Sequence, residues 1–138
     1  MRYLSVPDLH FQNNEISDQL FDRILQAADK HEVNFVAFVG DFFDGPIMAS
    51  DKGGINKCRA FFKKLSLICP SVAIYGTPSH EPPGSLDIFE DCGLTVLRPA
   101  QAYGFYFSDV YNPKIVPLNI NSGYMNPDAL LFGVPELN

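Results

Sequence analysis

Acidic residues and histidines recur in three short stretches of this 138-residue sequence, and each stretch closely follows an apolar run. Aspartate and histidine side chains without cysteine form a ligand set that suits divalent ions such as Mn²⁺, Fe²⁺ and Zn²⁺. Several carboxylates in one place would repel one another unless a cation compensated their charge. The three stretches are Asp8-Leu-His10, Gly40-Asp41-Phe-Phe-Asp44 and Gly76-Thr-Pro-Ser-His80-Glu81.

Each stretch taken alone has an ordinary explanation. An Asp-x-His pair is common without metal, Gly40-Asp41 could serve as a turn or a helix cap, and His80 could be a surface histidine. A nucleophilic triad of Ser79, His80 and Glu81 is disfavoured, because adjacent side chains point in different directions and a triad gathers its members from separated positions. The joint occurrence after three successive apolar runs therefore favours a metal site.

The apolar runs have the pattern of strands in a parallel sheet. The second run is nearly continuous and rich in Val and Phe, as expected of a strand buried on both faces. The predicted strands are 3–6, 33–39, 72–75 and 94–97. Apolar residues at helical spacing separate them, and the predicted helices are 16–28, 55–68 and 85–92. The order βαβαβαβ predicts an α/β fold with a mainly parallel sheet flanked by helices.

Such a sheet would position the three polar stretches. Ligands of open α/β sheets bind at the carboxyl ends of the strands, which lie at one edge. The side chains expected to converge there are Asp8, His10, Asp41, Asp44, His80 and Glu81.

The character of the sequence changes beyond Pro99. Three further strand-like runs are joined by Asn, Pro and Gly turns, with no helical pattern between them. These runs are 103–107, 114–118 and 129–132. We therefore expect one domain over residues 1–138, in which 1–98 form the βαβαβαβ half and 99–138 begin a second sheet.

The composition indicates a globular protein, with 46% apolar and 19% charged residues. No apolar run approaches the ~20 residues that span a bilayer, and the first residues lack the apolar stretch of a signal peptide. Cys58, Cys69 and Cys92 are odd in number and have no CxxC spacing. This pattern favours reduced thiols and a cytoplasmic location.

The formal net charge of −6 argues against a broad basic surface for nucleic acid. It does not exclude an enzyme that meets phosphates through bound metal ions. Basic residues do gather around the second predicted helix, where they could follow a DNA backbone or form a solvated helix face. They are Lys52, Lys57, Arg59, Lys63 and Lys64.

The three polar stretches resemble the first three motifs of the calcineurin-like metallophosphoesterase superfamily. The opening residues 1–10 and the segment 40–46 are most similar to its SbcD-type DNA-repair exonuclease branch. The resemblance covers residues 1–98. It implies a metal-dependent hydrolase of phosphodiester bonds, such as a DNA exonuclease, and the beginning of a four-layer αββα sandwich.

The resemblance also implies a ligand set for two ions, with Mn²⁺ the most expected. Asp8 and His10 would bind the first ion, and Asp41 would bridge both. Ser79 falls where the family has an asparagine that binds the second ion, and a serine hydroxyl is a shorter and weaker ligand. The two ions would polarise the phosphodiester and supply a hydroxide for in-line attack.

The remaining polar residues receive supporting or catalytic roles from the same resemblance. His80 would sit beside the scissile phosphate as a general acid or a transition-state stabiliser. Asp44 and Glu81 would orient their neighbours without binding the ions.

The sequence departs from the family in its histidines. The family completes its site with three later histidines, but this chain has only His10, His31 and His80. We therefore expect the chain to be the truncated N-terminal portion of a longer phosphoesterase, weakly active or inactive in isolation. The resemblance also implies DNA as substrate and an ATPase partner subunit.

Two other functions stay open. A phosphoesterase for small nucleotides would use the same metal chemistry and suits the acidic charge. A non-catalytic binding or assembly module would keep an incomplete metal site as a scaffold. Exposed strand edges in a short second sheet would in addition favour a homodimer.

Overall fold

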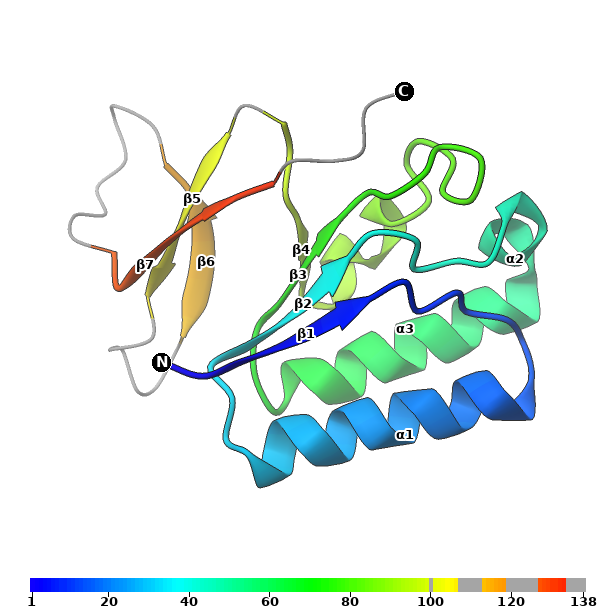
Figure 1. The fold of residues 1–138 in the computed structure, drawn as a ribbon, viewed down its shortest axis with the longest axis horizontal. Helices are drawn as coiled ribbons and strands as arrows, with labels where there is room; N and C mark the ends of the chain where they lie inside the picture. The colour runs from blue at the N-terminus through cyan, green and yellow to red at the C-terminus, as the bar shows by residue number, and fades with distance from the viewer. Residues whose placement is uncertain (100, 107–112, 119–126, 134–138) are drawn as a thin grey trace.

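The structure, a computed structural model, describes residues 1–99, 101–106, 113–118 and 127–133. The described elements form a larger sheet with helices and a smaller sheet (Figure 1). The first group comprises β1 (Tyr3–Pro7), α1 (Glu15–Lys30), β2 (Phe35–Val39), α2 (Pro46–Ser50), α3 (Lys52–Ser66), β3 (Ser71–Ile74), the 3₁₀ helix η1 (Asp87–Cys92) and β4 (Leu94–Val96). The second comprises β5 (Ala102–Tyr106), β6 (Lys114–Pro117) and β7 (Ala129–Phe132).

The larger sheet has four parallel strands in the order β1-β2-β3-β4. Pro7 pairs with Val39, and Val39 pairs with Ile74, so the first three strands end level with one another. Helices α1 and α3 lie side by side on one face of this sheet (Figure 1). The predicted α/β fold with a parallel sheet flanked by helices is therefore confirmed.

The helices begin and end at residues suited to those positions. The Asn14 side chain accepts a hydrogen bond from the Ser17 N–H at the start of α1, and Asp51 accepts one from the Gly54 N–H at the start of α3. The third predicted helix is a 3₁₀ helix, η1, which ends at Gly93 in the left-handed conformation. Helix α2 has five residues and was not predicted.

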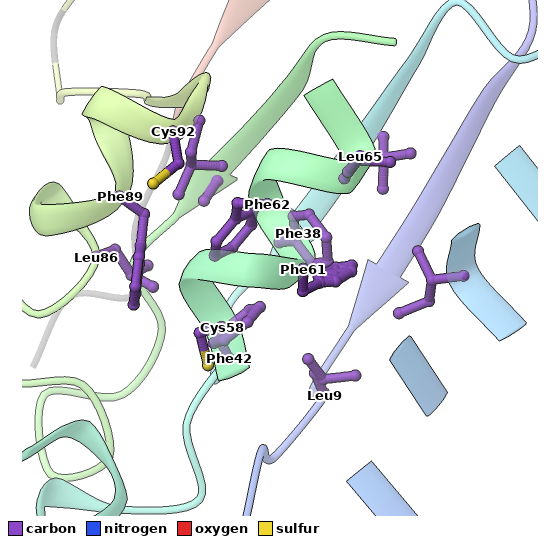
Figure 2. Packing of buried hydrophobic residues seen from close by; sticks show 14 of the residues in the cluster. Leu9, Phe38, Phe42, Cys58, Phe61, Phe62, Leu65, Leu86, Phe89 and Cys92 are labelled. Atoms are coloured by element: carbon purple, nitrogen blue, oxygen red, sulfur yellow. The ribbon is translucent and has the colours of Figure 1, made fainter. Parts of the chain in front are cut away.

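Aromatic rings fill the core between the larger sheet and α3 (Figure 2). Phe38 of β2 packs edge-to-face on Phe61 and Phe62, with ring centroids 5.9 and 5.6 Å apart. Phe42 stacks on Phe62 with a centroid distance of 5.4 Å. Such arrangements suit the quadrupoles of aromatic rings. Because Phe42 directly follows Asp41, this core also anchors the loop beyond β2.

The smaller sheet is antiparallel, with the order β6-β5-β7. It packs on the larger sheet through a second apolar cluster, in which the rings of Phe35 and Phe105 lie 5.1 Å apart. The three predicted strands of this half are present: β7 has the predicted ends, β6 ends one residue earlier and β5 begins one residue earlier. Phe107, at the end of the first predicted strand, lies outside the described residues.

The described residues contain no disulfide and no membrane span. Cys58, Cys69 and Cys92 are free and buried, and burial raises the pKa of Cys69 to about 11. Thiols of this kind behave as small core residues. No helix within the described ranges is long and apolar enough to cross a bilayer.

Candidate metal centre

The loops after β1 and β2 lie side by side at the carboxyl edge of the sheet. The His10 N–H donates to the Asp41 carbonyl at 3.0 Å, and the Phe11 N–H donates to the Phe42 carbonyl at 2.6 Å. The Asp44 N–H donates back to the Phe11 carbonyl at 3.1 Å. These bonds continue the parallel pairing beyond the strands and place His10 next to Asp41.

The loop after β3 forms a tight turn against Asp41. The N–H groups of His80 and Glu81 both donate to the Thr77 carbonyl, at 2.9 and 3.0 Å. The Thr77 N–H donates to Asp41 Oδ1 at 2.7 Å, and the Thr77 hydroxyl lies 3.3 Å from Asp41 Oδ2. Thr77 therefore orients the Asp41 carboxylate, while the turn brings His80 towards it.

Gly76 allows this close approach. A Cβ at Gly76 would lie 3.0 Å from the carboxyl carbon of Asp41 and closer still to the Asp41 backbone nitrogen and Oδ1. A larger residue would therefore push the loops after β2 and β3 apart.

Three side chains meet where the loops converge: His10, Asp41 and His80. Each offers one ligand atom, and these atoms all lie within 4.8 Å of one another. His80 Nδ1 lies 3.4 Å from Asp41 Oδ2, and the two imidazole rings are 5.3 Å apart. Within the described ranges no other group of His, Cys, Asp or Glu side chains comes this close together.

One imidazole nitrogen of each histidine in this group has no hydrogen-bond partner. Nδ1 of His10 and Nδ1 of His80 are both buried from solvent and unpaired. Each lies 3.4 Å from a carboxylate oxygen, of Asp44 and of Asp41 respectively, but forms no hydrogen bond with it. A divalent cation could bind one nitrogen of each ring together with the Asp41 carboxylate. The residues present therefore fit one divalent ion.

The backbone at this edge is strained. Asp8, His10 and Asp41 have φ values of 46°, 50° and 46°, in the left-handed region. This conformation costs a residue other than glycine about 1–2 kcal/mol. Strain of this kind gathers at functional sites, where the side chain has a role that glycine could not fill.

The other predicted site residues surround the group of three. Asp8 is exposed and lines a hollow beside α1, outside the group. Asp44 Oδ1 lies 3.4 Å from His10 Nδ1, which is where a supporting carboxylate would be placed. Ser79 is exposed on the turn after β3. The ligand roles of Asp8 and Ser79 stay predictions.

Glu81, in contrast, is 2% exposed. Its Oε1 accepts a hydrogen bond from the Phe42 N–H, and its Oε2 accepts one from the Gly76 N–H at 2.7 Å. Burial raises the pKa of Glu81, and the charge of Asp41 acts in the same direction, whereas the backbone hydrogen bonds oppose the shift.

Gly76 was recognised from the sequence as the glycine that opens the third polar stretch, but its close contact with Asp41 was not predicted. A glycine directly beyond a buried apolar run permits such a close backbone approach. Thr77 was assigned no role. Thr77 carries no comparable signal, since its contact with Asp41 depends on the conformation of two separate loops.

Two of the basic residues on α3 are already paired. Lys57 Nζ lies 3.0 Å from the Asp18 carboxylate, and an Arg59 guanidinium nitrogen lies 2.8 Å from the Asp91 carboxylate. This pairing reduces the positive charge that α3 could offer to a nucleic acid.

Fold and site together define an α/β protein with a candidate divalent-ion centre at the carboxyl edge of its parallel sheet. No protein-family model matches the chain, and no curated protein matches it significantly. The function must therefore be argued from the residues themselves.

Proposed function

We propose that the chain is part of a metal-dependent phosphodiesterase and supplies metal ligands at the carboxyl ends of its parallel strands. The meeting of His10, Asp41 and His80 at the ends of three adjacent parallel strands is the observation that carries this proposal. The choice of a phosphate ester as substrate rests on the resemblance of the three motifs to calcineurin-like metallophosphoesterases. The two packed sheets, with helices on the outer face of the larger one, are compatible with part of an αββα sandwich.

The residues divide into ligands and supports. His10, Asp41 and His80 would hold one divalent ion, which when bound supplies Lewis-acid polarisation of a phosphoryl oxygen. Asp44 and Thr77 would keep His10 and Asp41 oriented. In this arrangement His80 binds the ion, whereas the family resemblance implies that it acts as a general acid or a transition-state stabiliser.

The charge of the chain favours a small phosphodiester over a long duplex. The net charge is −6, and both Lys57 and Arg59 on α3 are engaged with carboxylates. A protein that follows a DNA backbone needs free cations to neutralise the phosphates. Cyclic nucleotides and dinucleotides are therefore the first substrates to compare with duplex DNA.

Hydrolysis of bis-p-nitrophenyl phosphate with Mn²⁺ tests the proposal, with linear duplex DNA as the second substrate. We expect the unchanged chain to hydrolyse the small ester slowly. EDTA should abolish this hydrolysis, and the Asp41→Asn variant should not hydrolyse the ester. A site holding one ion should be roughly 10²–10³-fold slower than one holding a pair, because it loses stabilisation of the developing charge.

Two outcomes would overturn the proposal. Hydrolysis that persists in EDTA would exclude the metal mechanism. Hydrolysis no faster than that of folded Asp41→Asn, in a chain shown by calorimetry to bind Mn²⁺, would exclude catalysis and leave a metal-binding module.

A further inference from the structure

We propose that Glu81 is a positioning residue whose carboxylate clamps the loops after β2 and β3 together and thereby sets the spacing of Asp41 and His80. The inference deepens the proposed function and rests on it, because it concerns the same ion. It assigns the geometry of the centre to a buried side chain that is not one of the three ligands.

The clamp joins two loops beyond the point where the backbone pairing of β2 and β3 ends. The last paired residues of β2 and β3 are Val39 and Ile74. Beyond them, the N–H groups of Phe42 and Gly76 donate to the two carboxylate oxygens of Glu81. The loops after β1 and β2 are instead joined by backbone bonds. Together with the Thr77 contacts to Asp41, Glu81 therefore links the third loop to the other two.

The position of Glu81 next to His80 makes the clamp effective. Both residues belong to one turn, because both N–H groups donate to the Thr77 carbonyl. His80 contributes to the group of ligands, whereas the Glu81 side chain is buried. Fixing the Glu81 carboxylate therefore fixes the turn that presents His80.

The chemistry of the clamp requires a carboxylate. Glu81 is 2% exposed, and it forms no ion pair with a described basic side chain, so backbone N–H groups must offset its loss of hydration. A carboxylate offers an acceptor oxygen to each loop, whereas a glutamine offers one acceptor and one donor group. In Glu81→Gln the NH₂ group would face a backbone N–H, and the two loops would separate.

Titration of the purified chain with Co²⁺, followed by the visible absorption of the bound ion, tests the clamp. We expect Glu81→Gln to bind Co²⁺ about 10–100-fold more weakly than the unchanged chain and to alter the spectrum, since the remaining ligands adopt a different geometry. Leu65→Ala is the matched control, because Leu65 is fully buried on α3 far from the loops. It should lower stability without changing Co²⁺ affinity.

Circular dichroism confirms that each variant is folded at the temperature of titration. A folded Glu81→Gln variant that binds Co²⁺ as tightly as the unchanged chain, with the same spectrum, would overturn the clamp. An unchanged chain that binds no Co²⁺ would instead overturn the proposed function, and this inference with it.

A second measurement needs no variant. Hydrogen exchange should show protected amides at Phe42 and Gly76 in the unchanged chain, although both lie beyond the strand ladders. Exchange at these two amides as fast as in an unstructured peptide would overturn the clamp even if Glu81→Gln failed to fold.

Discussion

Replacing Gly76 by alanine tests how closely the loops after β2 and β3 must approach. The new Cβ would lie 3.0 Å from the carboxyl carbon of Asp41, whereas ordinary contacts to a Cβ begin at 3.4 Å. Its contacts with the Asp41 backbone nitrogen and Oδ1 would be shorter still. The carboxylate cannot simply rotate away, because Thr77 holds it through hydrogen bonds of 2.7 and 3.3 Å.

The expected magnitude follows from this crowding. Overpacking of a buried position costs about 1–3 kcal/mol, which corresponds to a Tm decrease of roughly 3–12 °C for a domain of this size. Because the nearest of these contacts must open to about 3.4 Å, relief of the clash moves Asp41 by about an ångström, which exceeds the tolerance of about 0.5 Å for functional geometry. We therefore expect the affinity for Mn²⁺ to fall about 10–100-fold.

Isothermal titration calorimetry with Mn²⁺ and thermal unfolding in EDTA measure the two effects. Gly45→Ala is the matched control, because a Cβ at Gly45 meets nothing within 4 Å and its φ of 174° is extended. The reasoning is refuted if Gly76→Ala binds Mn²⁺ like the unchanged chain, or if Gly45→Ala weakens binding equally.

Three further predictions concern stability. Phe42→Ala should lower the free energy of unfolding by about 3–5 kcal/mol in urea titrations, because Phe42 is 2% exposed within the aromatic core. A loss below about 1 kcal/mol would contradict this packing. Asn14→Ala should cost about 0.5–2 kcal/mol by removing the cap of α1, with an unchanged urea m-value, and an unaltered urea midpoint would contradict the cap. Arg98→Gln should destabilise the chain more at pH 7 than at pH 3. Burial alone would raise the pKa of Asp87, but hydrogen bonds from Arg98 and Tyr75 outweigh it and hold that pKa below its usual 3.8. Because the folded-state pKa is lowered, the stabilisation is present above about pH 4 and is lost as the pH falls through the folded pKa. Urea midpoints that fall equally at both pH values would show that this ion pair contributes nothing.

The larger sheet could be predicted from the sequence because its strands are short apolar runs and its long helices are amphipathic. Both features are patterns of apolar residues, and such patterns can be recognised in the sequence without a structure. Helix α2 was missed because five residues are too few to show a period. Ile16, the first apolar residue of the predicted helix 16–28, is 70% exposed, whereas its polar neighbour Ser17 is buried.

The candidate site could be predicted as an edge of the sheet but not as a set of contacts. The polar stretches after β1, β2 and β3 do meet, because parallel strands end together. Which side chains point inwards depends on loop dihedrals such as the positive φ of Asp8 and His10, and periodicity carries no information about these. Hence Asp8 was grouped with the ligands and lies outside the group of three, whereas His80 lies beside Asp41 as predicted. The ligand role of Asp8 and the catalytic role of His80 stay predictions.

His10, Asp41 and His80 come from distant parts of the chain but from neighbouring strands of the sheet. An ion held by all three would therefore act as a reversible cross-link that closes two long loops, much as a disulfide does in an oxidised protein. The edge could then open only after the ion had left, and resistance to proteases would follow metal occupancy. In a cell short of metal, the same chain would be degraded sooner, so metal supply would set the lifetime of the protein.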